Sequence, residues 1–331
     1  MTATSSTSPP SRNGPAPKRA HAEYSMTLAA PAPTLYRLLS EVERWPLVFG
    51  PVVYAAAAES RPHGVNLWLH ADGRVERWSG ELWTRPYGLR FEFHRQPAAS
   101  GSGGASAAVY GSWDLEALAS ASTRVTLSWR TDPADADAIH TPIAVADPAG
   151  RVADLAAFAE LGDALDALVF SFEDTLRAAG DADDALWFLS RVQDWPGAIS
   201  HVATVKLDEP EPGVQFVHTG VRTPDGGVHE IPSVRICLPD RIVYTPLTVP
   251  PFASAHLGEW IVARRADGTA AITGRHAVAL HPDRIAAAFG PHATPADARS
   301  RVRAMLGAHS LATLEAARSH AESRTATQPG G

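Results

Sequence analysis

Histidine, serine and arginine alternate along the stretch Val228–Cys237. Because alternate residues of a β-strand share a face, His229, Ile231, Ser233 and Arg235 are predicted to project to one side. Histidine exchanges protons near neutral pH, whereas arginine keeps its charge and stabilises an enolate or alkoxide oxygen in a dry pocket. The spacing therefore predicts acid–base chemistry on a developing oxyanion, with the serine orienting a carbonyl or a water. A strand whose polar face is simply hydrated is the alternative interpretation.

Three histidines outside this stretch could join the site. His201 follows a predicted helix and would lie at a cavity mouth or on a surface loop, and it is a second candidate for moving protons. His256 lies on a predicted strand, and His309 lies in an apolar stripe of the last helix. Both are candidates for contacting substrate, although a histidine in such a stripe is also typical of a satisfied core residue.

Signatures of the common cofactor-dependent and hydrolytic enzymes are absent from the sequence. There is no G-x-S-x-G, G-x-x-x-x-G-K-[ST] or H-E-x-x-H, and His229-Glu230 lacks the second histidine of the zinc motif. Cys237 is the single cysteine, so it can form neither an intrachain disulfide nor a thiolate metal cluster. The sequence therefore predicts an activity without metal or nucleotide cofactor, in a reducing cytoplasm.

Composition excludes several classes of partner. The net charge of −7 argues against nucleic acid, because binding it requires a basic surface. No apolar run reaches the ~18 residues of a membrane span, so no membrane partner is expected. The N-terminus lacks the apolar region of a secretory signal, which agrees with a cytoplasmic location.

The chain contains an internal duplication centred on two Trp-Pro pairs. Leu35–Pro46 matches Ala185–Pro196 without a gap, at an offset of 195 − 45 = 150 residues. A self-match at half the chain length indicates two similar domains rather than a solenoid. Each copy is expected to have a strand, a short helix that ends at the tryptophan because proline follows, a run of strands, and a long final helix.

These patterns divide the chain into two domains and two tails. We expect a disordered tail at 1–20, domains at 21–167 and 168–321, and a disordered tail at 322–331. The predicted strands are His21–Ala29, Val65–Leu69, Arg74–Trp83, Leu89–Phe93, Ala107–Leu115 and Thr123–Arg130, then Val169–Leu176, Val202–Leu207, Gly213–Thr219, Val228–Leu238, Arg241–Val249, His256–Ala263 and Ala270–Leu280. The final helices are predicted at Arg151–Leu168 and at Pro295–Ala321, and loops at Ala99–Gly104 and Asp132–Pro148. The fold class is α+β, with each curved antiparallel sheet wrapped around its long helix and enclosing a cavity for an elongated apolar ligand.

Several motifs together identify a resemblance. They are the doubled Trp-Pro, Phe170–Asp174, Ser233–Cys237, Ala255-His256 and His309–Leu314. They resemble the di-domain aromatase/cyclases of bacterial type II polyketide synthases, over about residues 21–321. The resemblance implies two helix-grip (START-like) domains acting on a ketoreduced poly-β-ketone bound to an acyl carrier protein. It implies first-ring aldol cyclisation, usually joining carbons seven and twelve, and dehydration without a cofactor, alongside other synthase components.

The resemblance also implies roles for residues. Arg235 matches the pocket arginine of the family, and Leu82 stands at the corresponding position of the first copy. The sequence departs from the family at His309, where asparagine is common, and at Tyr244-Thr245-Pro246. The positions implied for substrate contact are Trp195, Ile231, Tyr244, His256 and His309, with Trp45, Trp78 and Glu76 in the first copy, which would hold the distal chain or act as a scaffold.

A non-catalytic carrier or scaffold that binds a hydrophobic polyketide-like ligand is the alternative function, because this fold often carries lipids. The cation at Arg235 separates the two interpretations, since a carrier of apolar ligands needs no buried charge.

Overall fold

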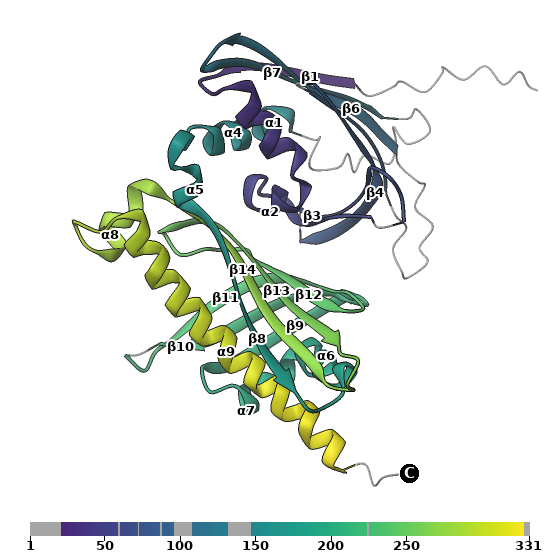
Figure 1. Cartoon of the computed structure of the whole chain (residues 1–331), viewed down its shortest axis with the longest axis vertical. Helices are drawn as coiled ribbons and strands as arrows, with labels where there is room; N and C mark the ends of the chain where they lie inside the picture. Colours follow the sequence, from purple (N-terminus) through teal and green to yellow (C-terminus); the bar gives the residue numbers. More distant parts are fainter. Residues whose placement is uncertain are drawn as a thin grey trace, which may run out of the picture.

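The computed structural model describes residues 21–327, apart from 59, 72, 87, 96–107, 132–146 and 224. It contains two seven-stranded antiparallel sheets, ordered β1-β7-β6-β5-β4-β3-β2 and β8-β14-β13-β12-β11-β10-β9 (Figure 1). The strands of the second sheet follow the same order as their counterparts in the first sheet. This confirms the duplication and the α+β class. The predicted N-terminal tail and the loops Ala99–Gly104 and 132–146 lie outside the described residues.

The first copy comprises one sheet and several short helices. Its strands are β1 (His21–Leu28), β2 (Val52–Ala57), β3 (Gly64–Ala71), β4 (Arg74–Arg85), β5 (Gly88–Arg95), β6 (Ala108–Ala119) and β7 (Ser122–Thr131). Its helices are α1 (Ala32–Ser40), η1 (Val42–Arg44), α2 (Trp45–Val48), α4 (Pro148–Ala159), η3 (Gly162–Ala164) and α5 (Leu165–Leu168). The sequence analysis missed β2, whose small residues Ala55, Ala56 and Ala57 carry a weak strand pattern.

The second copy repeats this plan with a longer final helix. Its strands are β8 (Val169–Ala178), β9 (Val202–Glu211), β10 (Val214–Arg222), β11 (Val228–Cys237), β12 (Arg241–Pro246), β13 (Ala253–Arg264) and β14 (Ala270–Leu280). Its helices are α6 (Ala182–Ser190), η4 (Val192–Asp194), α7 (Trp195–Ala198), η5 (Pro282–Arg284), α8 (Ile285–Phe289) and α9 (Pro295–Thr327). The predicted tail from Glu322 was wrong over its first six residues, because α9 continues to Thr327.

The predicted helix ends at Trp45 and Trp195 were also wrong. Helices α1 and α6 end five residues earlier, at Ser40 and Ser190. Each tryptophan then begins a new short helix with helical backbone angles (φ −54°, ψ −35° at Trp45). Proline in the first turn costs this new helix no hydrogen bond, because amides there have no intrahelical partner. The Trp45 indole N–H donates to the Leu39 carbonyl (3.1 Å), which folds the turn back onto α1.

The single helix predicted at Arg151–Leu168 is divided in the structure. After α4 the chain turns at Gly162, which has a positive φ of +51°, and continues through η3 into α5. Glycine adopts this left-handed conformation without steric cost, so the helix can break there. Helix α4 is therefore shorter than α9, and α5 leads directly into β8.

Strand pairing places corresponding residues of the two copies in the same register. Arg235 of β11 lies opposite Tyr244, Tyr244 opposite Gly258, Gly258 opposite His276, and His276 opposite Phe172. The same chain of partners in the first sheet runs through Leu82, Phe91, Gly111, Trp129 and Ala22. This row of paired residues carries Arg235, Tyr244 and His276 in the second sheet, whereas the corresponding row of the first sheet is apolar.

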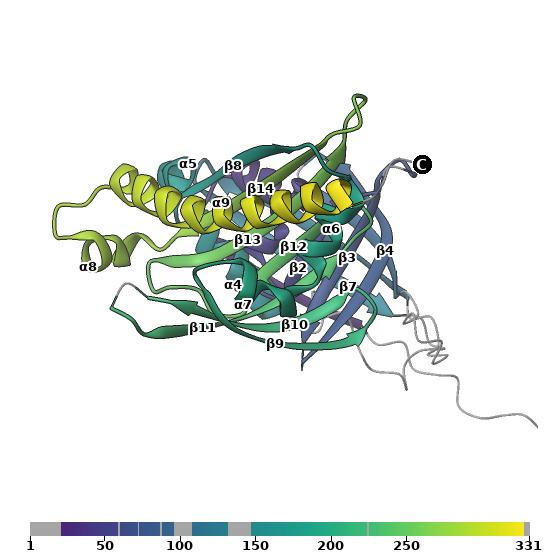
Figure 2. The same cartoon turned by 90° about the horizontal axis from the view of Figure 1, so that it is seen from below.

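The two faces of the second sheet have different neighbours. One face packs under α9, since Ser310 lies against Gly274 and Arg303 lies against Phe172. The opposite face joins the core of the first copy through Val234, Ile236, Val243 and Leu257. Helix α2 packs on β13 there, and the Thr245 hydroxyl donates to the Val53 carbonyl (3.0 Å). Figure 2 shows α9 lying along the outer side of the second sheet, away from the first copy.

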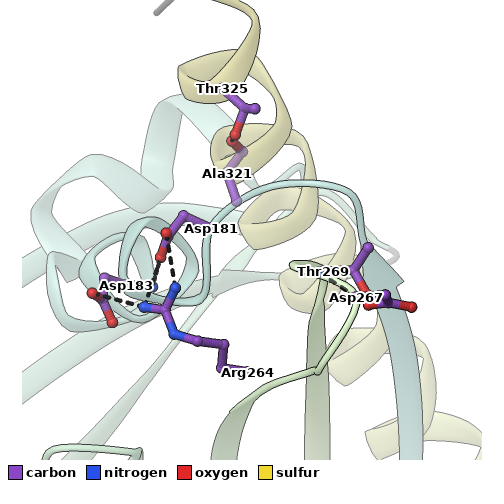
Figure 3. A network of polar contacts seen from close by, with 7 residues as sticks. All are labelled: Asp181, Asp183, Arg264, Asp267, Thr269, Ala321 and Thr325. Carbon is purple, nitrogen blue, oxygen red and sulfur yellow. Dashed lines mark hydrogen bonds and ion pairs between the residues drawn. The ribbon is translucent and has the colours of Figure 1, made fainter. Parts of the chain in front are cut away.

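Helix α6 is fixed at its N-terminus by charged side chains. Asp181 caps the helix by accepting from the Asp183 amide (2.7 Å). Arg264 at the end of β13 donates to both Asp181 oxygens and to Asp183, as Figure 3 shows. This network ties the helix to the sheet and sets the position of its other end, near Arg235.

Candidate active site

Arg235 is a buried cation on the face of the second sheet that packs under α9. Only 3% of its surface is exposed, and its guanidinium lies 5.1 Å from the centre of the Trp195 ring. One nitrogen, Nη2, donates to the Leu189 carbonyl at the end of α6 (2.5 Å). Its Nε and Nη1 have no hydrogen-bond partner among the described residues. Burial lowers the pKa of Arg235 to about 10, so the group stays charged at neutral pH and has donors left for a ligand.

Gln215 supports the same corner of the site. It lies opposite Arg235 on β10, is 4% exposed, and donates to the Ser190 carbonyl and to Glu209 (both 3.1 Å). Together the two side chains bind the last carbonyls of α6, which a helix leaves without internal partners. Gln215 was not predicted as a site residue, because only the register between β10 and β11 places it beside Arg235.

An aromatic and imidazole cluster continues from Arg235 across the sheet. The Tyr244 ring stacks on Trp260 (5.5 Å between centroids) and meets the His256 ring edge-on (6.0 Å). His256 Nε2 lies 3.0 Å from His276 Nδ1. Tyr244 and His256 are half-buried. Burial raises the pKa of Tyr244, which keeps its hydroxyl protonated.

His276 was missed in the sequence, although β14 alternates Ile272, Gly274, His276 and Val278 on one face. It is 3% exposed, and burial together with the Arg303 charge lowers its pKa to about 4. Burial and His276 lower the pKa of His256 to about 3. Both imidazoles are therefore neutral at pH 7.

These lowered pKa values predict acid destabilisation. An unfolded histidine has a pKa of about 6.5, so the unfolded chain binds protons first as the pH falls. The free energy of unfolding should fall between pH ~6.5 and ~4, by up to about 1.4 kcal/mol per pH unit for each such histidine. Urea unfolding at pH 7, 6 and 5 measures this slope, and His276→Phe should make it shallower. An equal slope in both proteins would contradict the prediction.

His201 and His309 come together at the edge of this face. Their rings stack with 4.5 Å between centroids, which joins the start of β9 to α9. Burial and the neighbouring His309 lower the pKa of His201 to about 4, and burial lowers the pKa of His309. The histidine that the sequence placed either at a cavity mouth or on a surface loop is thus packed against the last helix.

The remaining strand residues are not all brought together. Ser233 is 8% exposed and lies two residues from Arg235, with its hydroxyl 3.4 Å from the Val217 carbonyl. Ile231 follows on the same face and is half-buried. His229 is exposed at the far end of β11, six residues from Arg235 and so roughly 20 Å away along the strand. His229 and Arg235 therefore cannot act on the same bond.

The first copy presents a different environment. Trp45 and Trp78 are buried and line one cavity of about 30 Å³. The Trp78 indole donates to Glu76 (3.0 Å), so this carboxylate orients the tryptophan ring. Leu82 is buried where the second copy has Arg235. The position that is charged in the second sheet is thus aliphatic in the first.

Two kinds of feature are absent from the described residues, a membrane-spanning helix and a cluster of metal ligands. None of the helices in the described ranges has the length and hydropathy to cross a bilayer. No three His, Cys, Asp or Glu side chains within those ranges gather as metal ligands. What the geometry offers is a fixed cation, neutral imidazoles and a protonated phenol around an apolar wall, which suits carbon–carbon bond formation through an enolate.

Comparison with known proteins agrees with this chemistry. No protein-family model matches the chain. It is 37% identical to the granaticin polyketide synthase bifunctional cyclase/dehydratase of Streptomyces violaceoruber, over 91% of this chain and 94% of that protein. It is 35% identical to the actinorhodin polyketide synthase bifunctional cyclase/dehydratase of Streptomyces coelicolor, over 88% of this chain and 93% of that protein.

Solved structures give the same answer. The di-domain ARO/CYC StfQ of the steffimycin pathway superposes with a TM-score of 0.78 at 31% identity, covering 92% of this chain and all of that one. The di-domain ARO/CYC BexL of the BE-7585A pathway superposes with a TM-score of 0.76 at 32% identity, covering 94% of this chain and all of that one. Both are built as tandem domains, as this chain is. The chain therefore belongs to the family of polyketide synthase bifunctional cyclase/dehydratases.

Proposed function

We propose that the second copy closes the first ring of a ketoreduced poly-β-ketone, joining carbons seven and twelve, and then dehydrates it. The observation that carries this proposal is Arg235, a buried guanidinium with two N–H groups left for a ligand oxygen. An unpaired N–H group in a site without water costs free energy. An oxygen that becomes negative during the reaction is the acceptor that offsets this cost most. The two domains at 21–167 and 168–321 would divide binding and chemistry between them.

In the aldol step a methylene carbon loses a proton and attacks a ketone carbon. The new carbon–carbon bond forms as the carbonyl π bond opens, and the ketone oxygen becomes an alkoxide. Nε or Nη1 of Arg235 would donate to that oxygen, and Ser233 would orient the neighbouring carbonyl. Trp195 would form the apolar wall that holds the folded chain, because fixing both reacting carbons can supply several kcal/mol of the barrier.

Proton transfers complete the reaction. Neutral His256 would take the methylene proton, with His276 hydrogen-bonded behind it. The alkoxide is then protonated, and dehydration removes a proton from the adjacent carbon as the hydroxyl group leaves as water. The aldol step loses one water, and a reduced carbon within the new ring must lose its hydroxyl group as a second water before the ring is aromatic. His201, stacked on His309, is the second proposed proton carrier, and Tyr244 would donate its phenolic hydrogen to a substrate oxygen.

The partners follow from the substrate. The proposed substrate is bound to an acyl carrier protein, so the enzyme would work beside the other components of a type II polyketide synthase. Trp45, Trp78 and Glu76 of the first copy would hold the distal chain. We place the enzyme in the cytoplasm, where carrier-bound chains are made and where the single Cys237 stays reduced.

Reconstitution with a minimal synthase and a ketoreductase tests the proposal. With the protein present, the product should contain an aromatic first ring closed between carbons seven and twelve. Without it, the same chains should give unaromatised or differently folded products. An unchanged product profile would refute catalysis, and tight binding of the chain with no change in product would instead support a carrier.

A further inference from the structure

Arg303 of α9 is held in a fixed orientation by an acidic side chain of β8. Its Nη1 donates to Asp174 Oδ2 (2.8 Å) and its Nη2 donates to Asp174 Oδ1 (2.6 Å). Two parallel hydrogen bonds of this kind fix the plane of the guanidinium as well as its position. Only 18% of the Asp174 side chain is exposed, so the pair is less screened by water than most surface ion pairs.

A glycine one turn further along α9 makes room for this guanidinium. Gly307 is buried, and a Cβ atom added there would overlap Arg303 Nη1. Glycine inside a helix is less favourable than alanine, so its presence in the middle of α9 requires a packing reason. The space that it leaves for Arg303 supplies that reason.

Arg303 is the first of four flat groups that lie in a row. Its guanidinium lies 4.4 Å from the centre of the Phe172 ring. The Phe172 ring stacks on His276, with 4.9 Å between centroids and 22° between planes. The ring of His276 is in turn nearly parallel to that of His256 (17°). The four groups come from α9, β8, β14 and β13, so packing between these elements sets the orientation of the two imidazoles.

The described part of the first copy has no such row. At the register positions of His276 and Phe172 it carries Trp129 and Ala22. Both copies share the same fold, so the fold alone does not require the row. Its presence only beside the buried cation of the second copy connects it with the chemistry proposed there.

The orientation of His276 decides which nitrogen of His256 is free. His256 Nε2 lies 3.0 Å from His276 Nδ1, so one of these two atoms donates to the other. For His256 to take a substrate proton at Nδ1, its own hydrogen must lie on Nε2 and be donated to His276. A turn of the His276 ring would break this hydrogen bond and allow the hydrogen of His256 to move to Nδ1.

We propose that Arg303 is a positioning residue for His256. Held by Asp174, it keeps the Phe172 ring against His276, and His276 keeps the hydrogen of His256 on Nε2. Arg303 contacts Phe172 and Asp174 rather than the reacting atoms, so it acts through the orientation of the rings. This inference rests on the proposed function, in which His256 takes the methylene proton.

Gly307→Ala tests this role without weakening the helix. The added methyl group takes the space of Arg303 Nη1 and should displace the guanidinium from Asp174. In the reconstituted synthase, the maximal rate of aromatisation should fall about ten- to a hundredfold, as expected of a misplaced catalytic group, with KM unchanged. The thermal midpoint should change little, because the helix propensity of alanine offsets the lost ion pair. A wild-type rate would mean that Arg303 only joins α9 to β8.

Substitutions of Arg303 separate orientation from charge. Arg303→Met should slow aromatisation to a similar extent, because methionine packs on Phe172 but cannot bind Asp174. Arg303→Lys should restore little, since an ammonium group lacks the planar fork. Arg299→Met is the matched control, because Arg299 lies over Phe170 (5.0 Å) one turn earlier on α9, and it should leave the rate unchanged. A full rate in Arg303→Lys, or an equal loss in Arg299→Met, would overturn the proposal.

Nitrogen NMR of the resting protein separates this inference from the proposed chemistry. With isotope-labelled histidine and His256→Gln for assignment, the ring-nitrogen shifts at pH 7 should place the hydrogen of His256 on Nε2 in the wild type. In Arg303→Met and Gly307→Ala both nitrogens should share it. No substrate is needed, so the result stands even where Arg235→Met leaves the product unchanged. Identical His256 signals in all three proteins, or a wild-type hydrogen on Nδ1, would overturn the inference.

Discussion

Arg235→Met should abolish first-ring aromatisation while the protein stays folded. The missing charge acts mainly on the alkoxide, and a donor of this kind is worth about 3–4 kcal/mol, or a hundred- to a thousandfold in rate. Methionine keeps contact with Trp195, whereas Arg235→Ala would also leave space beside the ring. Arg235→Lys should restore only part of the rate, because a point charge lacks the planar fork of arginine.

The measurement compares product profile and thermal midpoint in the reconstituted system. Leu82→Ala in the first copy is the matched control, since Leu82 occupies the same register position. It should cost about 2–5 kcal/mol of stability, yet still give the aromatic product. If Arg235→Met forms that product at the wild-type rate, the chemistry does not lie in the second copy.

Ile236→Asp, one residue further along β11, should do the opposite and unfold the protein. Ile236 is 2% exposed and belongs to the core shared with the first copy. An unpaired carboxylate there costs several kcal/mol, a large part of the 5–15 kcal/mol that stabilises a typical domain. Because the residue joins both copies, the two should lose stability together.

Urea unfolding followed by tryptophan fluorescence tests this expectation. Ile236→Val deletes one methyl group and should cost only about 0.5–1.5 kcal/mol. Wild-type stability in Ile236→Asp would mean that the two copies do not pack as described. The side chains of Arg235 and Ile236 would then not lie on faces with different neighbours.

The fold could be predicted from the sequence largely because the two copies confirm each other. The alternation within β11 placed Arg235 and Ser233 on one face, and the offset of the Trp-Pro pairs gave the duplication. The turn after Ser40 could not be predicted, because the tryptophan packs back onto α1 and overrides the preference of residues before proline. The preference of a residue before proline for an extended backbone holds for the isolated chain. The contact of Trp45 with α1 in the folded protein overrides it.

The site was harder to predict than the fold. His276 and Gln215 lie beside Tyr244 and Arg235 only because five strands pair in register, which no single segment reveals. His229 lies on the same face of β11 as Arg235, but at an end of the strand that is exposed to solvent. Two residues on one strand face therefore need not lie in the same site.

The contact between the copies uses different surfaces on its two sides. The first copy presents α2, and the second presents the back of its sheet, so the joint is of the head-to-tail kind that could be repeated without end. At the matching register the back of the first sheet carries Glu81, Trp83, Arg90, Tyr110 and Arg130 where the second carries Val234, Ile236, Val243, Leu257 and Ala277. Seating another α2 there would strip water from Arg90 and Arg130, which are exposed. The back of the first sheet is therefore unsuited to the contact that the back of the second sheet makes.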